Sequence, residues 1–142
     1  MSNAMVPELA VTDWRNSRRF YCDVLGFKVE YERPDEGFSY LSRGQAELMI
    51  DQIGVGRDFD NGHLPRNHPF GRGVNLQIRT EGVRNLQEAL LLNGIGLFLR
   101  LEDRWYRVGT SETGNRQFVV ADPDGYLLRF YEEIGVCDQA IP

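Results

Sequence analysis

Apolar and polar residues follow an order of elements that occurs twice along the chain. The alternation at 6–11 predicts a strand, and apolar residues at helical spacing predict a helix that Asp13 caps and Gly26 ends. Strand-like runs follow at 27–32, 38–42 and 46–53. The second series has strands at 74–78, 95–101, 117–121 and 127–132, with a helix that ends at Asn93-Gly94. The offset of about 67 residues indicates a duplicated βαβββ module.

The tetrapeptide Asp122-Pro123-Asp124-Gly125 predicts a turn that leads into the last strand. In that strand, Leu127, Arg129 and Tyr131 share one face, and Leu128 and Phe130 share the other. A buried charge without a partner is costly, so we expect Arg129 to face a solvated cleft or an anionic group.

Composition predicts one globular domain. The chain has 142 residues, a net charge of −5 and two cysteines. The negative charge argues against nucleic acid as a partner, and no apolar run is long enough to predict a membrane span. The two cysteines fit a cytoplasmic protein. We expect residues 1–5 to be an expression-tag remnant and start, 6–133 the domain and 134–142 a tail; within the domain, module one covers 6–53, the linker 54–72 and module two 73–133.

Three groups of residues carry a family resemblance: Val11-Thr12-Asp13 with Ser17, Phe20-Tyr21 with Leu25-Gly26-Phe27, and the Asp-Pro-Asp-Gly turn. In this order and spacing the chain resembles the vicinal oxygen chelate superfamily, which includes glyoxalases, extradiol dioxygenases and bleomycin-resistance proteins. The resemblance covers Val6 to Glu133. It implies an α+β fold, in which two βαβββ modules form a curled sheet around a ligand-binding cleft, and it implies a homodimer.

The resemblance also gives the positions at which metal-dependent members carry their ligands. Those positions hold Val6, Gly73 and Arg129 here, and Asp51 is the nearest match to the fourth. Metal sites need converging His and carboxylate donors, and a guanidinium repels a cation. We therefore expect no metal and no cofactor.

The cleft implied by the resemblance has a polar and an aromatic set of candidate ligand-binding residues. The polar set is Asp51, Asn75, Gln77, Arg129 and Tyr131. The aromatic set is Phe38, Tyr40 and Trp105, together with Tyr106 and Arg107 beside the tryptophan. Alternatives stay open: an internal Asp51–Arg129 ion pair, a solvated outer face for the two amides, and a core position for the aromatic residues.

Two segments are predicted to lie outside regular structure. The linker 54–72, which contains Asp58-Phe59-Asp60, His63 and His68, is either a functional lid or a plain connector. The stretch Gly109–Gly114 is expected to be a flexible polar loop.

The sequence supports three hypotheses about function. The first is metal-independent binding and sequestration of a small cationic or aromatic molecule, as the resemblance to bleomycin-resistance proteins implies. The second is a glyoxalase-like or dioxygenase-like lyase or oxidoreductase. The third is a structural or regulatory partner protein with a vestigial cleft.

Overall fold

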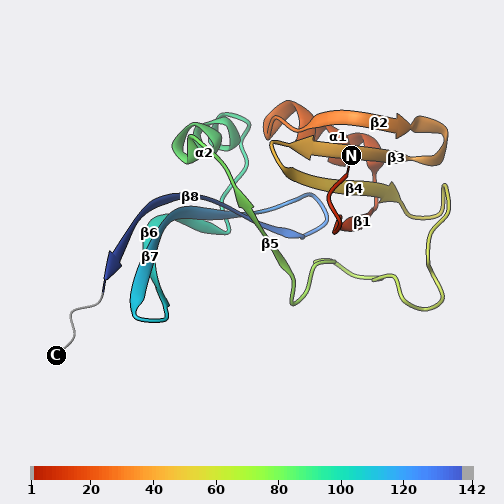
Figure 1. Ribbon diagram of the computed structural model, residues 1–142. Coiled ribbons are helices and arrows are strands. Elements are labelled where there is room, and N and C mark those ends of the chain that lie inside the picture. Colours follow the sequence, from red (N-terminus) through yellow and green to blue (C-terminus); the bar gives the residue numbers. More distant parts are fainter. Residues whose placement is uncertain (1, 139–142) are drawn as a thin grey trace. The chain divides into compact units, whose positions relative to one another are not determined.

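The computed structural model describes residues 2–138 and divides them into two compact units. Unit 1 contains the chain up to Val74 together with Asp122–Tyr126, and unit 2 contains Asn75–Ala121 and the chain from Leu127 onward. Each unit holds one helical segment and one four-stranded sheet (Figure 1). The predicted α+β fold of two βαβββ modules is thereby confirmed. No helix in residues 2–138 is long and apolar enough to cross a bilayer.

Unit 1 has the strand order β1-β4-β3-β2. β1 runs parallel to β4, and the other neighbours are antiparallel. The elements are β1 Glu8–Val11, α1 Trp14–Arg19, a π-helical turn Phe20–Val24, β2 Lys28–Arg33, a 3₁₀ turn Pro34–Glu36, β3 Phe38–Arg43 and β4 Ala46–Gln52.

The first helical segment, made of α1 and the π-helical turn, begins and ends where its sequence signals predict. The Asp13 carboxylate caps it by accepting a hydrogen bond from the Asn16 N–H at 3.2 Å, and Gly26 follows it with φ of +78°. Trp14 lies on its buried side and donates from Nε1 to Ser39 Oγ of β3 at 2.7 Å. The sheet face on this side forms the core of unit 1, with Leu9, Val11, Leu41, Leu48 and Ile50 all buried.

Unit 2 repeats this topology with the strand order β5-β8-β7-β6, and β5 runs parallel to β8. Its elements are β5 Asn75–Arg79, α2 Val83–Leu92, β6 Leu99–Val108, β7 Ser111–Ala121 and β8 Leu127–Asp138. The predicted division of β8 into two faces is confirmed, because Leu128 and Phe130 are fully buried and the intervening Arg129 is not.

The hairpin of β6 and β7 is longer than the sequence predicts. Ser111–Gly114, expected in a flexible loop, pairs with β6, and only Gly109 and Thr110 form the turn. β6 starts at Leu99 instead of Ile95, and β8 continues to Asp138. Residues 111–116 are mostly polar, so their hydrophobicity pattern does not indicate a strand. They form one because their backbone N–H and C=O groups bond to β6 on one side and to β8 on the other.

The Asp-Pro-Asp-Gly turn packs within unit 1, although its sequence position follows β7. Tyr21 donates its hydroxyl to Asp122 Oδ2 at 2.6 Å, and Tyr126 donates its hydroxyl to the Ala10 carbonyl at 2.9 Å. Burial raises the pKa of Asp122 to about 6.

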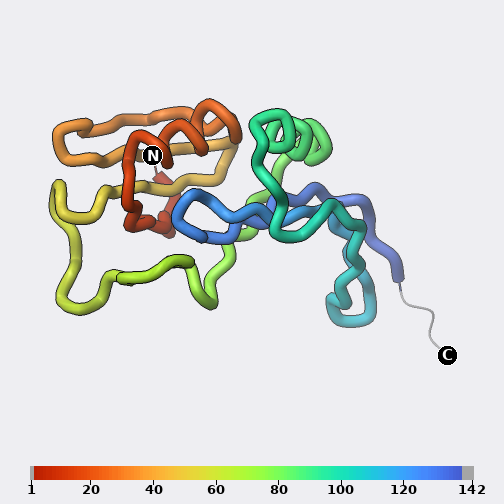
Figure 2. The backbone as a smooth tube through the Cα atoms, turned by 180° about the vertical axis from the view of Figure 1, so that it is seen from behind, coloured from red at the N-terminus to blue at the C-terminus, as the bar shows by residue number. Residues whose placement is uncertain are grey.

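The same turn holds the linker 54–72, which Figure 2 traces as an irregular tube without helix or strand. His68 Nε2 lies 2.9 Å from Asp124 Oδ1, and the Phe70 N–H donates to the Asp124 carbonyl at 2.8 Å. These two contacts with Asp124 fix the end of the linker to the turn.

Candidate functional site

Three predicted site residues lie on the sheet face of unit 1 that points away from α1. Phe38 of β3 pairs with Asp51 of β4, and Tyr40 lies two residues along β3 on the same face. Asp51 also lies beside Ala10 of β1. The strand pairing thus places the three predicted residues on one surface.

Asp51 borders a hollow of about 180 Å³ in unit 1. Its side chain is only 8% exposed, yet its carboxylate takes part in no hydrogen bond or ion pair among the described residues. Two further carboxylates, Glu8 from β1 and Asp58 from the linker, line the same hollow. The other lining residues are Ala10, Ile53, Phe59, His63 and Leu64.

This setting makes Asp51 a weak acid. Burial is the main cause, and the negative charges of Glu8 and Asp58 add to it, so that the pKa of Asp51 rises to about 6. Arg33 opposes this effect and Glu36 reinforces it. Near neutral pH the hollow therefore holds an ionised carboxylate that lacks a protein partner.

We expect the Asp51→Asn variant to become more stable relative to the parent as the pH rises. A carboxyl group with a higher pKa in the folded than in the unfolded state binds its proton more tightly in the folded state. The resulting stabilisation is complete below the ordinary pKa of 3.8 and is lost as the pH rises through the folded pKa of about 6. Asparagine does not titrate, so the variant should gain about 1–3 kcal/mol on the parent between pH 4.5 and 8. Urea denaturation at both values measures this, with Asp35→Asn as the exposed control. An equal difference at both pH values would contradict it.

Phe38 and Tyr40 are shielded although they lie on the open face. The Arg33 guanidinium lies 4.1 Å from the centre of the Phe38 ring, and Tyr31 stacks on Tyr40 at 5.2 Å. The Tyr40 hydroxyl donates to Glu47 Oε2 at 2.9 Å. Both predicted aromatic residues are therefore buried, and Tyr31 is the exposed ring of this cluster.

Tyr40 also borders a shallow hollow of about 580 Å³. Ser2 and Asn3, from the segment expected to be a tag remnant, form part of its lining. We assign no function to this hollow, because its wall includes residues that the sequence analysis sets outside the domain.

In unit 2, four of the predicted residues line one open pocket of about 440 Å³. They are Gln77, Tyr106, Arg129 and Tyr131, and the strands β6, β7 and β8 add Val108, Thr113, Asn115 and Glu133. The parallel pairing of β5 with β8 sets Gln77 beside Arg129. The predicted polar face of β5 and β8 thus forms a real concave surface.

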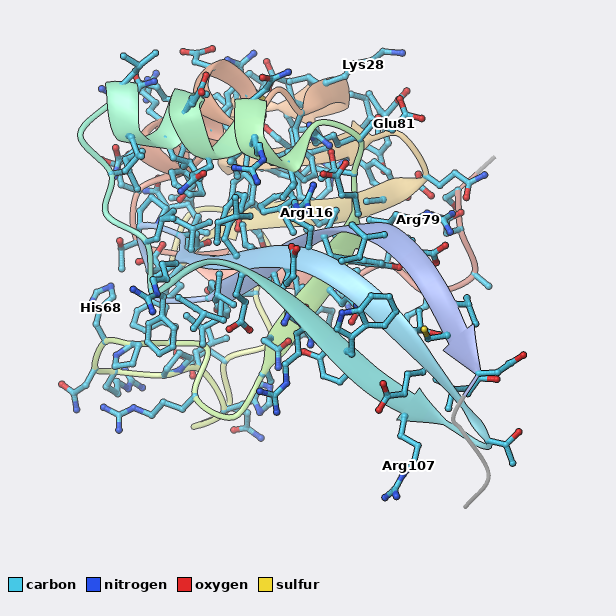
Figure 3. All side chains as sticks on the ribbon, turned by 90° about the vertical axis from the view of Figure 1, so that its left-hand side faces the viewer. Lys28, His68, Arg79, Glu81, Arg107 and Arg116 are labelled. Atoms are coloured by element: carbon cyan, nitrogen blue, oxygen red, sulfur yellow. The ribbon has the colours of Figure 1, made fainter. Side chains whose placement is uncertain are left out.

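Three other predicted residues of unit 2 do not line this pocket. Trp105 and Arg107 precede and follow Tyr106 in β6, so they project from the opposite face of the strand. The Trp105 ring lies across Gly114 and remains 41% exposed, while Arg107 extends away from the hairpin (Figure 3). Asn75 is exposed at the start of β5.

The residues at the positions where the resemblance implies metal ligands do not fit a metal ion. Val6 and Gly73 have no donor side chain, and Arg129 is a cation. Among residues 2–138, no three His, Cys, Asp or Glu side chains are grouped closely enough to hold a metal. The carboxylates around Asp51 line a common hollow without converging on a point.

Several lining residues escaped the sequence analysis. Glu8 could have been found, since it alternates with Ala10 on the same face of β1. Thr113 and Asn115 were not predicted, because the sequence analysis expected β7 to begin at 117 and not at Ser111. Phe59 comes from a linker that the sequence identifies as either a lid or a plain connector.

Comparisons with known proteins agree on one family. The family model described as "Glyoxalase/Bleomycin resistance protein/Dioxygenase superfamily" matches residues 4–130. Bleomycin resistance proteins from Geobacillus stearothermophilus and Staphylococcus aureus are each 28% identical over 135 residues, which cover 91% of this chain and 96% of the relative.

Solved structures show the same fold. TioX from Micromonospora sp. ML1 has a TM-score of 0.68 at 20% identity, covering 93% of this chain and 100% of that one. A virulence protein from Salmonella typhimurium has a TM-score of 0.67 at 19% identity, covering 94% and 98%.

Proposed function

The chain belongs to the Glyoxalase/Bleomycin resistance protein/Dioxygenase superfamily, and on that premise we propose that it binds and sequesters a small cationic or aromatic molecule without a metal ion. The predicted family is confirmed, and the chain is similar over nearly its whole length to bleomycin resistance proteins. The proposal includes a homodimer that acts in the cytoplasm.

The unpartnered carboxylate of Asp51 is the observation that carries this proposal. It is nearly buried, it borders a hollow with two further carboxylates, and the structure gives it no hydrogen bond. Burial and the neighbouring negative charges disfavour the ionised form of Asp51 unless a positive charge compensates them. A bound organic cation, such as an ammonium or guanidinium group, would supply that charge.

The remaining walls favour an organic cation over a metal ion. Phe59, Leu64 and Ile53 are apolar, and an aromatic ring attracts cations through its face. Metal binding would instead require several donors within bonding distance of one point, and the described residues do not provide them. No observation in residues 2–138 favours the glyoxalase-like or dioxygenase-like alternative.

Calorimetric titration with metal-free bleomycin, in buffer with EDTA at pH 7.5, tests the proposal. We expect saturable binding that EDTA does not weaken. We also expect Asp51→Asn to bind at least about 10-fold more weakly, because a charge partner in a desolvated pocket is lost. At this pH Asp51 is mainly ionised, since its pKa is about 6.

Glu88→Gln provides the charge-matched control, because Glu88 is exposed on α2 and lines neither hollow. Its affinity should equal that of the parent. If both variants bind bleomycin equally weakly, the effect of Asp51→Asn comes from the change in net charge and not from a contact with the ligand. Binding that requires added metal would overturn the proposal.

A further inference from the structure

The open pocket of unit 2 has chemistry opposite to that of the Asp51 hollow. Arg129 lies at its β5 side, between Gln77 on one neighbouring strand and Val119 on the other. Its Nε is buried without a hydrogen-bond partner, and the side chain takes part in no ion pair of the described chain. A buried guanidinium donor without an acceptor is costly, so this charge is available to a ligand.

Tyr106 adds a second donor to the same pocket. The Gln117 side chain is 2% exposed, and its Nε2 donates to the Tyr106 hydroxyl oxygen at 2.6 Å and to Glu102 Oε1 at 3.2 Å. Because the phenol oxygen accepts this bond, its own O–H is free to donate elsewhere. Tyr106 lines the pocket and therefore keeps a hydroxyl donor that no described residue uses.

The remaining wall combines amide and hydroxyl groups with rings. Gln77, Asn115 and Thr113 can each donate a hydrogen bond, and Tyr106, Tyr131 and Val108 supply apolar surface. The pocket volume of about 440 Å³ is within the ordinary range for small-molecule sites. These groups suit a flat ligand that carries an anionic end.

Glu133 is the acidic side chain in this lining, and it lies far from Arg129. The two are four residues apart on one face of β8, which corresponds to about 13 Å along a strand. Glu133 is also exposed, so water screens its charge. The end of the pocket beside Arg129 therefore keeps its positive character.

From this geometry we propose that the Arg129 pocket of unit 2 binds small aromatic carboxylates. The carboxylate accepts hydrogen bonds from the Arg129 guanidinium, and the aromatic part lies against Tyr131, which shares the same face of β8. Its lining shares no residue with the cation-binding hollow of unit 1.

Three probes of similar size and different charge test the site: benzoate, benzamide and benzylamine. Each is titrated into ¹⁵N-labelled full-length protein, and backbone amide shifts report the position of binding. We expect benzoate to shift the resonances of β5 around Gln77 and of β7 around Gln117 and Val119. Benzamide should bind at least about 10-fold more weakly, since it lacks the charge that a guanidinium recognises.

Variants of Arg129 make the test specific. Arg129→Gln should lower the benzoate affinity to that of benzamide, and Arg129→Lys should give an intermediate value, because lysine keeps the charge but loses the planar fork. Arg100→Ala, which removes an exposed charge elsewhere on β6, should leave it unchanged. Far-ultraviolet circular dichroism confirms that each variant is folded.

Equal affinity of benzoate for the parent and for Arg129→Gln would overturn the inference, as would shifts that map away from the strands beside Arg129. Neither result would affect the cation proposal, which depends on Asp51. Conversely, the Asp51→Asn variant should lose bleomycin binding and still show the same chemical-shift changes with benzoate as the parent.

Discussion

Replacing Asp124 by alanine is expected to destabilise unit 1 by about 2–4 kcal/mol, because the donors that bond to its buried carboxylate lose their acceptor. The Asp124 carboxylate is fully buried. It accepts hydrogen bonds from the Thr12 N–H at 3.1 Å and the Thr12 hydroxyl at 2.7 Å, and His68 Nε2 lies 2.9 Å from it. Alanine leaves these groups without their partner and removes the His68 contact of the linker, while the Phe70 N–H bond to the backbone carbonyl of residue 124 remains.

Urea denaturation followed by circular dichroism measures this loss. Asp35→Ala is the control, because Asp35 is exposed in the same unit and a surface change of this kind stays within about 0.5 kcal/mol. A loss below about 1 kcal/mol for Asp124→Ala would show that the network contributes little.

Gly125→Ala is expected to cost about 2–4 kcal/mol through left-handed backbone strain combined with steric overlap. Gly125 has a φ of +85°, and a Cβ there would lie 2.4 Å from Pro69 Cβ and 2.7 Å from Pro69 Cα. The proline ring is rigid, so the linker has to move to make room.

Gly26→Ala separates the two causes. Gly26 has a similar φ of +78°, but a Cβ there would meet no atom within 4 Å. It should therefore show the backbone strain alone, about 1–2 kcal/mol. If thermal unfolding shows equal losses for the two variants, overlap with Pro69 contributes nothing.

The sequence predicts local elements, such as turns and strand faces, better than it predicts which distant residues those elements contact. Four residues are enough to predict the turn at Asp122–Gly125, and alternation correctly assigns the faces of β8, because both depend on local backbone geometry. The contacts of Asp124 with Thr12 and His68 span 112 and 56 residues. No local pattern encodes such distances.

The candidate site divides in the same way. The family resemblance implies that Gln77, Arg129 and Tyr131 share a cleft, and the parallel pairing of β5 with β8 places them on one surface. Tyr106 and Trp105 were predicted as a pair, but a strand turns neighbouring side chains to opposite faces, and that depends on recognising β6 up to Val108. The hollow at Asp51 depends on the course of the linker, which lacks the periodicity of a helix or strand.

The assignment of Asp122–Tyr126 to unit 1 has a consequence for how the chain folds during synthesis. Domains usually fold as they leave the ribosome, with the N-terminal one first. Here the first unit lacks the partner of Tyr21 until Asp122 has emerged, and by then most of the second unit has been translated. Unit 1 therefore cannot complete its fold before residues 122–126 have been synthesised. A fragment that stops at Val74 would lack a part of its own core.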